Sequence, residues 1–128
     1  MSAGSVSRLE IVVEIKGKSQ LKCDLKRHLA PVTVGNIIRS LPLEGNAHIM
    51  NNSFAYMETK LNVGGERQRK EFKKGDVAFM TANGSICFFL NNTESSKTMT
   101  PIGTITSNIE ALNDVKPGDV FLITQAGC

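Results

Sequence analysis

The sequence predicts a mainly β domain, either a closed barrel or a sandwich, with two short helices. Short runs rich in Val, Ile, Leu and Phe recur along the chain, separated by turn residues such as Gly, Asn and Asp. Only two segments have helical character. A length of 128 residues suffices for one sizeable core but not for two ordinary domains.

The N-terminal third is predicted to be a β-hairpin followed by a helix. Apolar and polar residues alternate in places within residues 9–15 and 21–25, and the residues between them, 16–18, are typical of a turn. Pro31 favours a helix start, and Leu41-Pro42 ends the helix. The apolar stripe of this helix consists of Val34, Ile37, Ile38 and Leu41.

Two hairpins are predicted in the middle of the chain. In the first, a polar tip over residues 62–69 separates a strand at 54–59 from one around 70–72. After a turn at 74–76, the runs Val77–Met80 and Ile86–Leu90 form the second hairpin. These two runs are the most hydrophobic part of the chain.

The remaining sequence predicts a long loop, a short strand, a short helix and a closing strand. Residues 91–100 are polar or small apart from Met99, and we expect a surface loop long enough to serve a function. Residues 102–105 are a predicted strand, 108–112 a helix that Ser107 or Asn108 caps, and 120–124 the last strand. The domain is expected over residues 9–124, with a flexible N-terminus at 1–8 and a tail at 125–128.

Composition and residue spacing narrow the classes of partner, location and cofactor to expect. A formal charge of +3 does not by itself indicate a nucleic-acid partner. No signal peptide or membrane span is recognised, so we expect a cytoplasmic protein. Cys23, Cys87 and Cys128 lack the spacing of a disulfide framework or a zinc site, and His28 and His48 have no partner at metal-ligand spacing. We therefore predict no metal and no cofactor.

Three motifs, in order along the chain, resemble the cyclophilins. Ala30-Pro31-Val32-Thr33-Val34-Gly35-Asn36-Ile37 is similar to the Pro-x-Thr-x-x-Asn-Phe at the start of their first helix. Gly84-Ser85-Ile86-Cys87-Phe88-Phe89-Leu90 resembles their Gly-Ser-Gln-Phe-Phe-Ile strand, with one extra residue. Ile102-Gly103-Thr104-Ile105 resembles their Phe-Gly-Lys-Val. The resemblance covers residues 9–124 and implies a closed antiparallel β-barrel.

Gly75-Asp76-Val77-Ala78-Phe79 adds a likeness to small archaeal and bacterial cyclophilin-like proteins, a group with no settled activity. In cyclophilins, an arginine donates a hydrogen bond to the prolyl nitrogen as the imide twists. The strand that would carry it, residues 53–57, has no arginine in any register. The glutamine of the family becomes Cys87, its histidine falls near Met99, its tryptophan is missing, and Phe89 alone keeps the family residue type. We therefore assign no catalytic residue and expect no efficient prolyl isomerase activity.

What the resemblance leaves is a binding module for a peptide or a small apolar ligand. Core packing is the alternative role for each residue of the expected cleft, because barrel interiors need alternate apolar residues. Tyr56 is the first choice for a functional group, since its hydroxyl needs a partner. The expected cleft is lined by Phe54, Tyr56, Phe79, Met80, Phe89 and Met99.

Two alternatives stay open, a weak prolyl isomerase and an RNA-binding protein. Nucleic acid is not expected as a partner, because Glu66 and Glu71 interrupt the basic residues and no aromatic residues for base stacking are interleaved with them. We expect a monomer or a weak homo-oligomer. The basic residues concerned are Arg67, Arg69, Lys70, Lys73 and Lys74, with Lys16, Lys18 and Lys22 on neighbouring hairpins.

Overall fold

The computed structural model describes residues 8–126. Most of the N-terminus and tail expected from the sequence lies outside the described residues, as does Cys128. Arg8 already belongs to the first strand, β1 (Arg8–Ile15), and the last strand, β9 (Val120–Gln125), extends into the expected tail. The other elements are β2 (Ser19–Lys26), α1 (Pro31–Ser40), β3 (Leu43–Met50), β4 (Phe54–Glu58), β5 (Arg69–Phe72), β6 (Asp76–Met80), β7 (Ser85–Phe89), β8 (Thr93–Ser107) and the 3₁₀ helix η2 (Ile109–Asp114).

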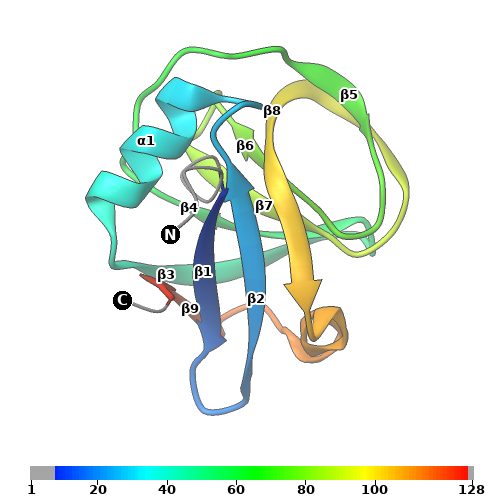
Figure 1. Ribbon diagram of the computed structural model, residues 1–128. Helices are drawn as coiled ribbons and strands as arrows, with labels where there is room; N and C mark the ends of the chain where they lie inside the picture. The colour runs from blue at the N-terminus through cyan, green and yellow to red at the C-terminus, as the bar shows by residue number, and fades with distance from the viewer. Residues whose placement is uncertain (1–7, 127–128) are drawn as a thin grey trace.

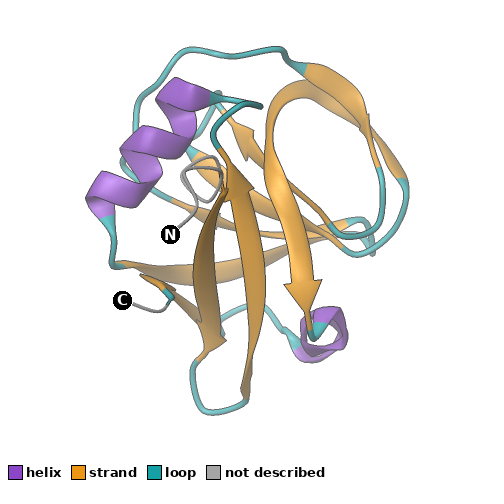
Figure 2. Cartoon of the chain, viewed as in Figure 1, coloured by secondary structure: helices purple, strands orange, loops and turns teal. Residues whose placement is uncertain are grey.

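The strands form a closed antiparallel barrel, as predicted. Hydrogen bonding follows the order β2-β1-β9-β3-β4-β7-β6-β8, and a pairing between β2 and β8 joins the two ends. The strand β5 lies outside this ring and pairs with β8. Figures 1 and 2 show α1 beside the barrel and an arm, formed by β5 and the first half of β8, on the opposite side. The closure excludes the sandwich that composition alone had left open.

Both hairpins expected from tight turns next to apolar runs are present, but the hairpin between residues 54–59 and 70–72 is not. β1 pairs with β2, and β6 pairs with β7 with Val77 opposite Phe88. In contrast, β4 pairs with β3 and β7, whereas β5 pairs with β8. The segment between β4 and β5 is a long connection that reaches α1 instead.

That connection caps the helix. α1 receives no hydrogen bond from the side chain of its own N-cap residue, Ala30. Instead, the carboxylate of Glu66 accepts hydrogen bonds from the backbone amides of Val32 (3.2 Å) and Thr33 (2.8 Å) and from the Thr33 hydroxyl (2.8 Å). The Glu66 amide donates to the Thr100 hydroxyl on β8 (3.1 Å). Glu66 thus joins α1, the connection and β8, and supplies acceptors that helix N-termini need.

Two expectations for strands are wrong. The strand β3 was not predicted, although Leu43, Ala47 and Ile49 alternate with polar residues, because Gly45 and Ala47 give a weak strand signal. Residues 93–100 are not a surface loop but the first half of β8. Their polar residues form a strand because they pair with β5, with an irregular register, and Met99 is the one apolar residue among them that is buried.

The short helix is present and Asn108 occupies its N-cap position, one of the two predicted, but the predicted side-chain cap is missing. η2 begins after Asn108, which has a left-handed φ of 63° and no side-chain capping bond. The Asn108 side-chain amide donates to the Gln20 carbonyl on β2 instead, at 2.7 Å. The amide therefore ties the end of β8 to the N-terminal hairpin and is not available to the helix.

Alternate residues of the barrel strands belong to two separate apolar clusters. The inner cluster fills the barrel with side chains from strands all round it, including Val13, Phe88 and Phe121. The outer cluster lies on the other face of β4, β6 and β7, under the arm. It consists of Phe54, Phe72, Ala78, Met80, Cys87, Phe89 and Met99, with Tyr56 packed against it.

Candidate functional site

Aromatic rings form a continuous row across the outer cluster. Phe72 of β5 stacks on Phe89 of β7 with centroids 4.7 Å apart, and Phe89 contacts Phe54 of β4 at 5.0 Å. The row continues from Phe54 to Tyr56 (5.8 Å) and from Tyr56 to its cross-strand partner His48 (5.0 Å, stacked). Contacts at these distances add to the stability gained from burial.

The residues of the expected cleft divide between the two clusters. Phe54, Met80, Phe89 and Met99 belong to the outer cluster, with Tyr56 against it. Phe79 does not belong there, because successive residues of a strand face opposite sides and Phe79 points into the barrel. Its expected place in the cleft is therefore corrected.

Most of the expected cleft wall is covered. Phe89 and Met99 are fully buried, and Phe54 and Met80 are 4% and 8% exposed. Part of the cover is Phe72, a residue that the sequence reasoning did not assign to the cleft. It is the one buried residue of β5 and is itself 3% exposed. Its position as the only apolar residue in a charged run could have predicted that it is buried.

An open cleft of about 440 Å³ lies next to this covered part. Its apolar wall combines Phe54, Tyr56 and Met80 with Met50, a side chain that is 42% exposed. Residues of β8 and of two turns form its polar lining: Asn51, Ser53, Asn83, Thr93, Glu94, Ser95, Ser96 and Lys97. An apolar wall with polar groups at its rim can bind a ligand that has an apolar group and hydrogen-bonding atoms.

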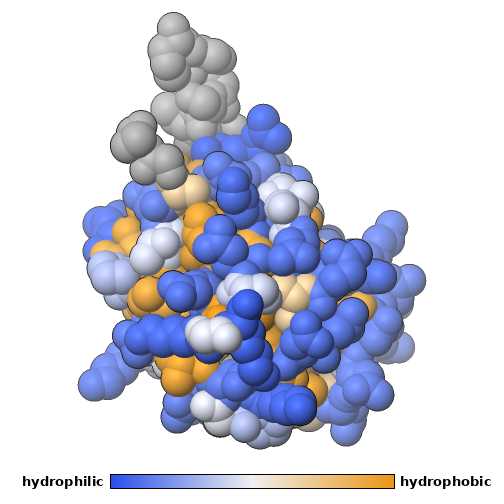
Figure 3. All heavy atoms as spheres, turned by 90° about the horizontal axis from the view of Figure 1, so that it is seen from below, coloured by the Kyte–Doolittle hydropathy of each residue, from blue (hydrophilic) through white to orange (hydrophobic). Residues whose placement is uncertain are grey.

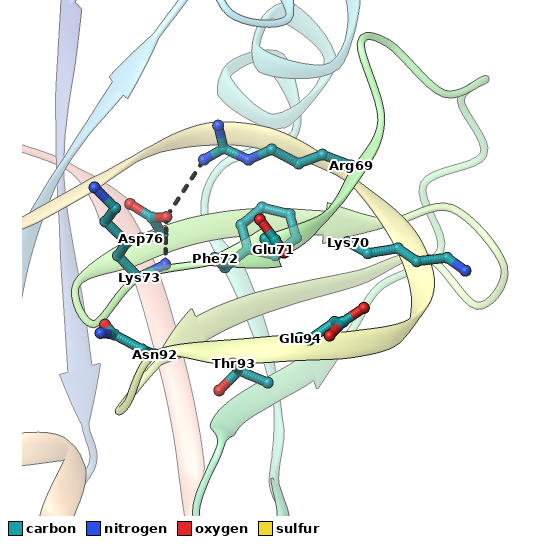
Figure 4. Close-up of a pocket in the computed structure, with 9 residues that line it drawn as sticks. All are labelled: Arg69, Lys70, Glu71, Phe72, Lys73, Asp76, Asn92, Thr93 and Glu94. Atoms are coloured by element: carbon teal, nitrogen blue, oxygen red, sulfur yellow. Dashed lines mark hydrogen bonds and ion pairs between the residues drawn. The ribbon is translucent and has the colours of Figure 1, made fainter.

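A second, wider cavity of about 930 Å³ lies over the arm (Figure 4). The Arg69 guanidinium lies above the Phe72 ring, with Cζ 4.9 Å from its centroid, and approaches the Asp76 carboxylate at 3.3 Å. Asp76 also accepts a hydrogen bond from the Lys73 amide at 2.8 Å. Lys70, Glu71 and Glu94 line the same cavity, so charges of both signs are mixed here. Such a surface does not select for an anion.

Arg67 and Arg69, the arginines that follow β4 in the chain, both make contacts away from that strand. Arg67 donates a hydrogen bond from Nη1 to the His28 carbonyl at 2.9 Å, and Arg69 pairs with Asp76. Both side chains are exposed, and they belong to the connection and to β5 and not to a hairpin with β4. Tyr56, in the middle of β4, lies opposite Cys87.

Two of the three N-terminal lysines of the basic set, Lys16 and Lys18, form ion pairs. Lys16 pairs with Glu44 at 2.9 Å, and Lys18 pairs with Asp119 at 2.7 Å. Figure 3 shows hydrophilic residues covering most of the face seen from below, where apolar residues reach the surface in separate areas. The paired charges reduce the attraction that these lysines offer to a polyanion.

The geometry of the described residues supports neither a nucleophilic cysteine nor a metal site. Cys23 and Cys87 are buried and free, and burial strongly raises the pKa of both thiols, with Asp24 adding to the effect at Cys23. A buried thiol with a raised pKa is a poor nucleophile. Within residues 8–126, no three His, Cys, Asp or Glu side chains converge as metal ligands would. Helices in the same range are all too short or too polar to span a bilayer.

Solved structures of low sequence identity share this fold. The solution structure of the hypothetical protein AF2241 from Archaeoglobus fulgidus matches with a TM-score of 0.80 and 22% identity, over 94% of this chain and 96% of that one. McbB, solved in complex with tryptophan, matches with a TM-score of 0.74 and 14% identity, over 92% of this chain and 45% of McbB. At these identities the likeness concerns the fold alone.

Among curated proteins, none matches the chain. The family model described as the Cyclophilin-like family matches residues 30–124. This range begins just before α1 and ends in β9, so it includes the strands β3 to β8 that build the aromatic row and the open cleft. The chain therefore belongs to the Cyclophilin-like family.

Proposed function

We propose that this protein is a binding module whose open cleft takes an aromatic or large apolar group, presented by a peptide or by a small molecule. The observation that carries the proposal is the cleft of about 440 Å³ in which Tyr56, Phe54 and Met50 meet the polar start of β8. Tyr56 is half-buried, stacks on His48 and contacts Phe54 in a tilted arrangement, so its ring is held in place where it lines the cleft. A fixed aromatic wall binds another ring at little entropic cost.

The chain covers 45% of McbB, which was solved in complex with tryptophan, and this ligand makes an aromatic group the first to propose for the cleft. The mixed polar rim supports a ligand with amide or similar groups next to its ring. Glu94 and Lys97 both line the cleft, so neither a strongly anionic nor a strongly cationic ligand is favoured.

The proposal excludes efficient prolyl isomerisation. Electrostatic stabilisation of the twisted imide needs a preorganised donor, and loss of one such donor typically slows a reaction by about 10² to 10³. Arg67 and Arg69, the nearest candidates along the chain, hold the His28 carbonyl and the Asp76 carboxylate instead. A cytoplasmic location and a monomeric or weakly associating state are further parts of the proposal.

Calorimetric titration with N-acetyl-tryptophan amide and N-acetyl-leucine amide tests the cleft. We expect saturable binding that depends little on salt and weakens at least about tenfold in Tyr56→Ala, because truncation of a buried aromatic anchor costs more than about 1.4 kcal/mol. Tyr56→Phe, which keeps the ring, should retain most of the affinity. The matched control is Val32→Ala, which removes an exposed apolar side chain from α1, outside the cleft lining, and should leave the affinity unchanged.

Three results would overturn the proposal. Equal binding by wild type and Tyr56→Ala would place the ligand elsewhere. A protease-coupled assay showing isomerisation at cyclophilin-like efficiency would reinstate the enzyme. Binding of single-stranded RNA that disappears in moderate salt, with chemical-shift changes at Lys70 and Lys73, would favour the nucleic-acid alternative.

A further inference from the structure

One strand of the arm, β5, inserts a single side chain into the outer cluster. Within β5, Arg69, Lys70 and Glu71 are exposed, and Phe72 alone is buried. The Phe72 ring stacks on Phe89 almost in parallel, at 15°. A charged strand with one buried ring contributes little to the barrel core except that ring.

β5 has few other attachments to the barrel. β5 pairs with β8 alone, and this pairing is irregular, with a register shift between Arg69 and Glu71. Like charges face each other across it, since Glu71 lies opposite Glu94, which weakens the pair. The Arg69 contact with Asp76 is half-exposed and therefore worth little. Next to Phe72, the Arg69 guanidinium lies over the ring, and the Lys73 amide donates a hydrogen bond to Asp76. Burial of the Phe72 ring is the largest single attachment of β5.

The surface under Phe72 continues into the open cleft. Phe54 lines that cleft, and its ring is 5.0 Å from Phe89, the ring on which Phe72 stacks. Thr93 and Glu94 line both the open cleft and the cavity over the arm, so the start of β8 separates the two. Without the Phe72 ring, Phe89 would become an extension of the wall formed by Phe54 and Tyr56.

We propose that Phe72 is an internal ligand, occupying a second aromatic subsite that is continuous with the Tyr56 cleft. The ligand class that fits is one with two aromatic groups in tandem, one for the open cleft and one that displaces Phe72 from Phe89. This inference deepens the proposed function and rests on it for the first of the two groups. The second ring of the ligand can bind only in those molecules whose Phe72 has left Phe89. The apparent affinity of the ligand is therefore the intrinsic affinity multiplied by the fraction of molecules with an open subsite. Removing the Phe72 ring opens the subsite in every molecule and so removes this loss of affinity.

The test compares N-acetyl-Phe-Phe-amide with N-acetyl-Phe-Ala-amide, by calorimetry, on wild type and on Phe72→Ala. We expect Phe72→Ala to bind the two-ring peptide at least about tenfold more tightly than wild type does, because the subsite is then always open. The affinity for the one-ring peptide should stay within about twofold. Phe121→Ala, which removes a ring from the inner cluster, is the matched control and should not tighten binding of either peptide.

Unchanged or weaker binding of the two-ring peptide by Phe72→Ala, with the one-ring peptide still bound, would show that Phe72 is only part of the core. The proposed function would then survive and this inference would not.

If neither peptide binds either protein, the subsite is tested by adding toluene and recording chemical shifts, because an apolar cavity left by a deleted ring binds small aromatic molecules. Toluene-induced shifts at Phe89 and Phe54 in Phe72→Ala but not in wild type would support the subsite although the cleft had failed, and their absence would overturn it. If Phe72→Ala folds poorly, Phe72→Val provides the same comparison with a smaller opening.

Discussion

The carboxylate of Glu66 accepts two hydrogen bonds from Thr33, one from its backbone amide and one from its hydroxyl, each 2.8 Å long. Thr33 is in the first turn of α1 and fully buried, whereas Glu66 comes from the connection between β4 and β5. The pair therefore fixes how the connection crosses from the barrel to the helix. It also orients the segment that leads into β5 and the arm over the outer cluster.

Glu66→Ala should lower the free energy of unfolding by about 1 kcal/mol, the usual cost of losing an N-terminal cap. Glu66→Gln keeps one acceptor oxygen and should lose less. Urea denaturation of both variants measures the difference. Glu14→Ala, at an exposed position of β1, is the control and should stay within about 0.5 kcal/mol of wild type. If Glu66→Ala matched that control, the cap would have no energetic role.

The same carboxylate should make stability depend on pH. Partial burial raises the pKa of Glu66, but the hydrogen bonds from Thr33 and Val32 and the charge of Arg67 outweigh it, and the pKa lies below its usual range. The stabilisation is therefore complete above the unfolded pKa of about 4.3 and is lost as pH falls through the lower folded pKa. Between about pH 5 and pH 3, wild type should lose more stability than Glu66→Gln. Parallel curves of melting temperature against pH for the two proteins would contradict this.

Gly103→Ala should prevent proper closure of the barrel. Gly103 lies in β8 between Leu25 of β2 and Val77 of β6, and a Cβ added to it would collide with the Asp24 carbonyl oxygen. That oxygen is backbone in a paired strand and cannot move away without breaking the ladder. We expect a loss of about 3 kcal/mol or more. Gly64→Ala, whose Cβ would have no neighbour within 4 Å, is the matched control in the same denaturation experiment.

Cys23 and Cys87 should react with a thiol reagent only after unfolding. Both are fully buried, and burial raises the pKa of both thiols, so the reactive thiolate is scarce at neutral pH. Cys128→Ser leaves these two thiols alone for measurement with a chromogenic disulfide. The modification rate should then follow the rate of unfolding across a denaturant series. Rapid modification of either thiol in native buffer would contradict their place in the two clusters.

Local sequence signals predicted the elements that local chemistry determines. The turn between β6 and β7, the Pro31 start of α1 and the closing strand β9 all depend on residues close together in the chain. Alternation along β6 could also have excluded Phe79 from a cleft shared with Met80, because neighbouring residues of a strand face opposite sides. The three motifs predicted the family to which the chain belongs.

Other features required the tertiary structure because partners far apart in sequence create them. The polar start of β8 is a strand because β5 pairs with it, and Glu66 is a cap because the connection reaches α1. Likewise, Phe72 covers the outer cluster because the irregular pairing with β8 brings its ring onto Phe89. The sequence by itself determined a barrel with an aromatic wall. The tertiary structure decided how much of that wall stays open, because burial and pairing between distant segments leave no local periodicity in the sequence.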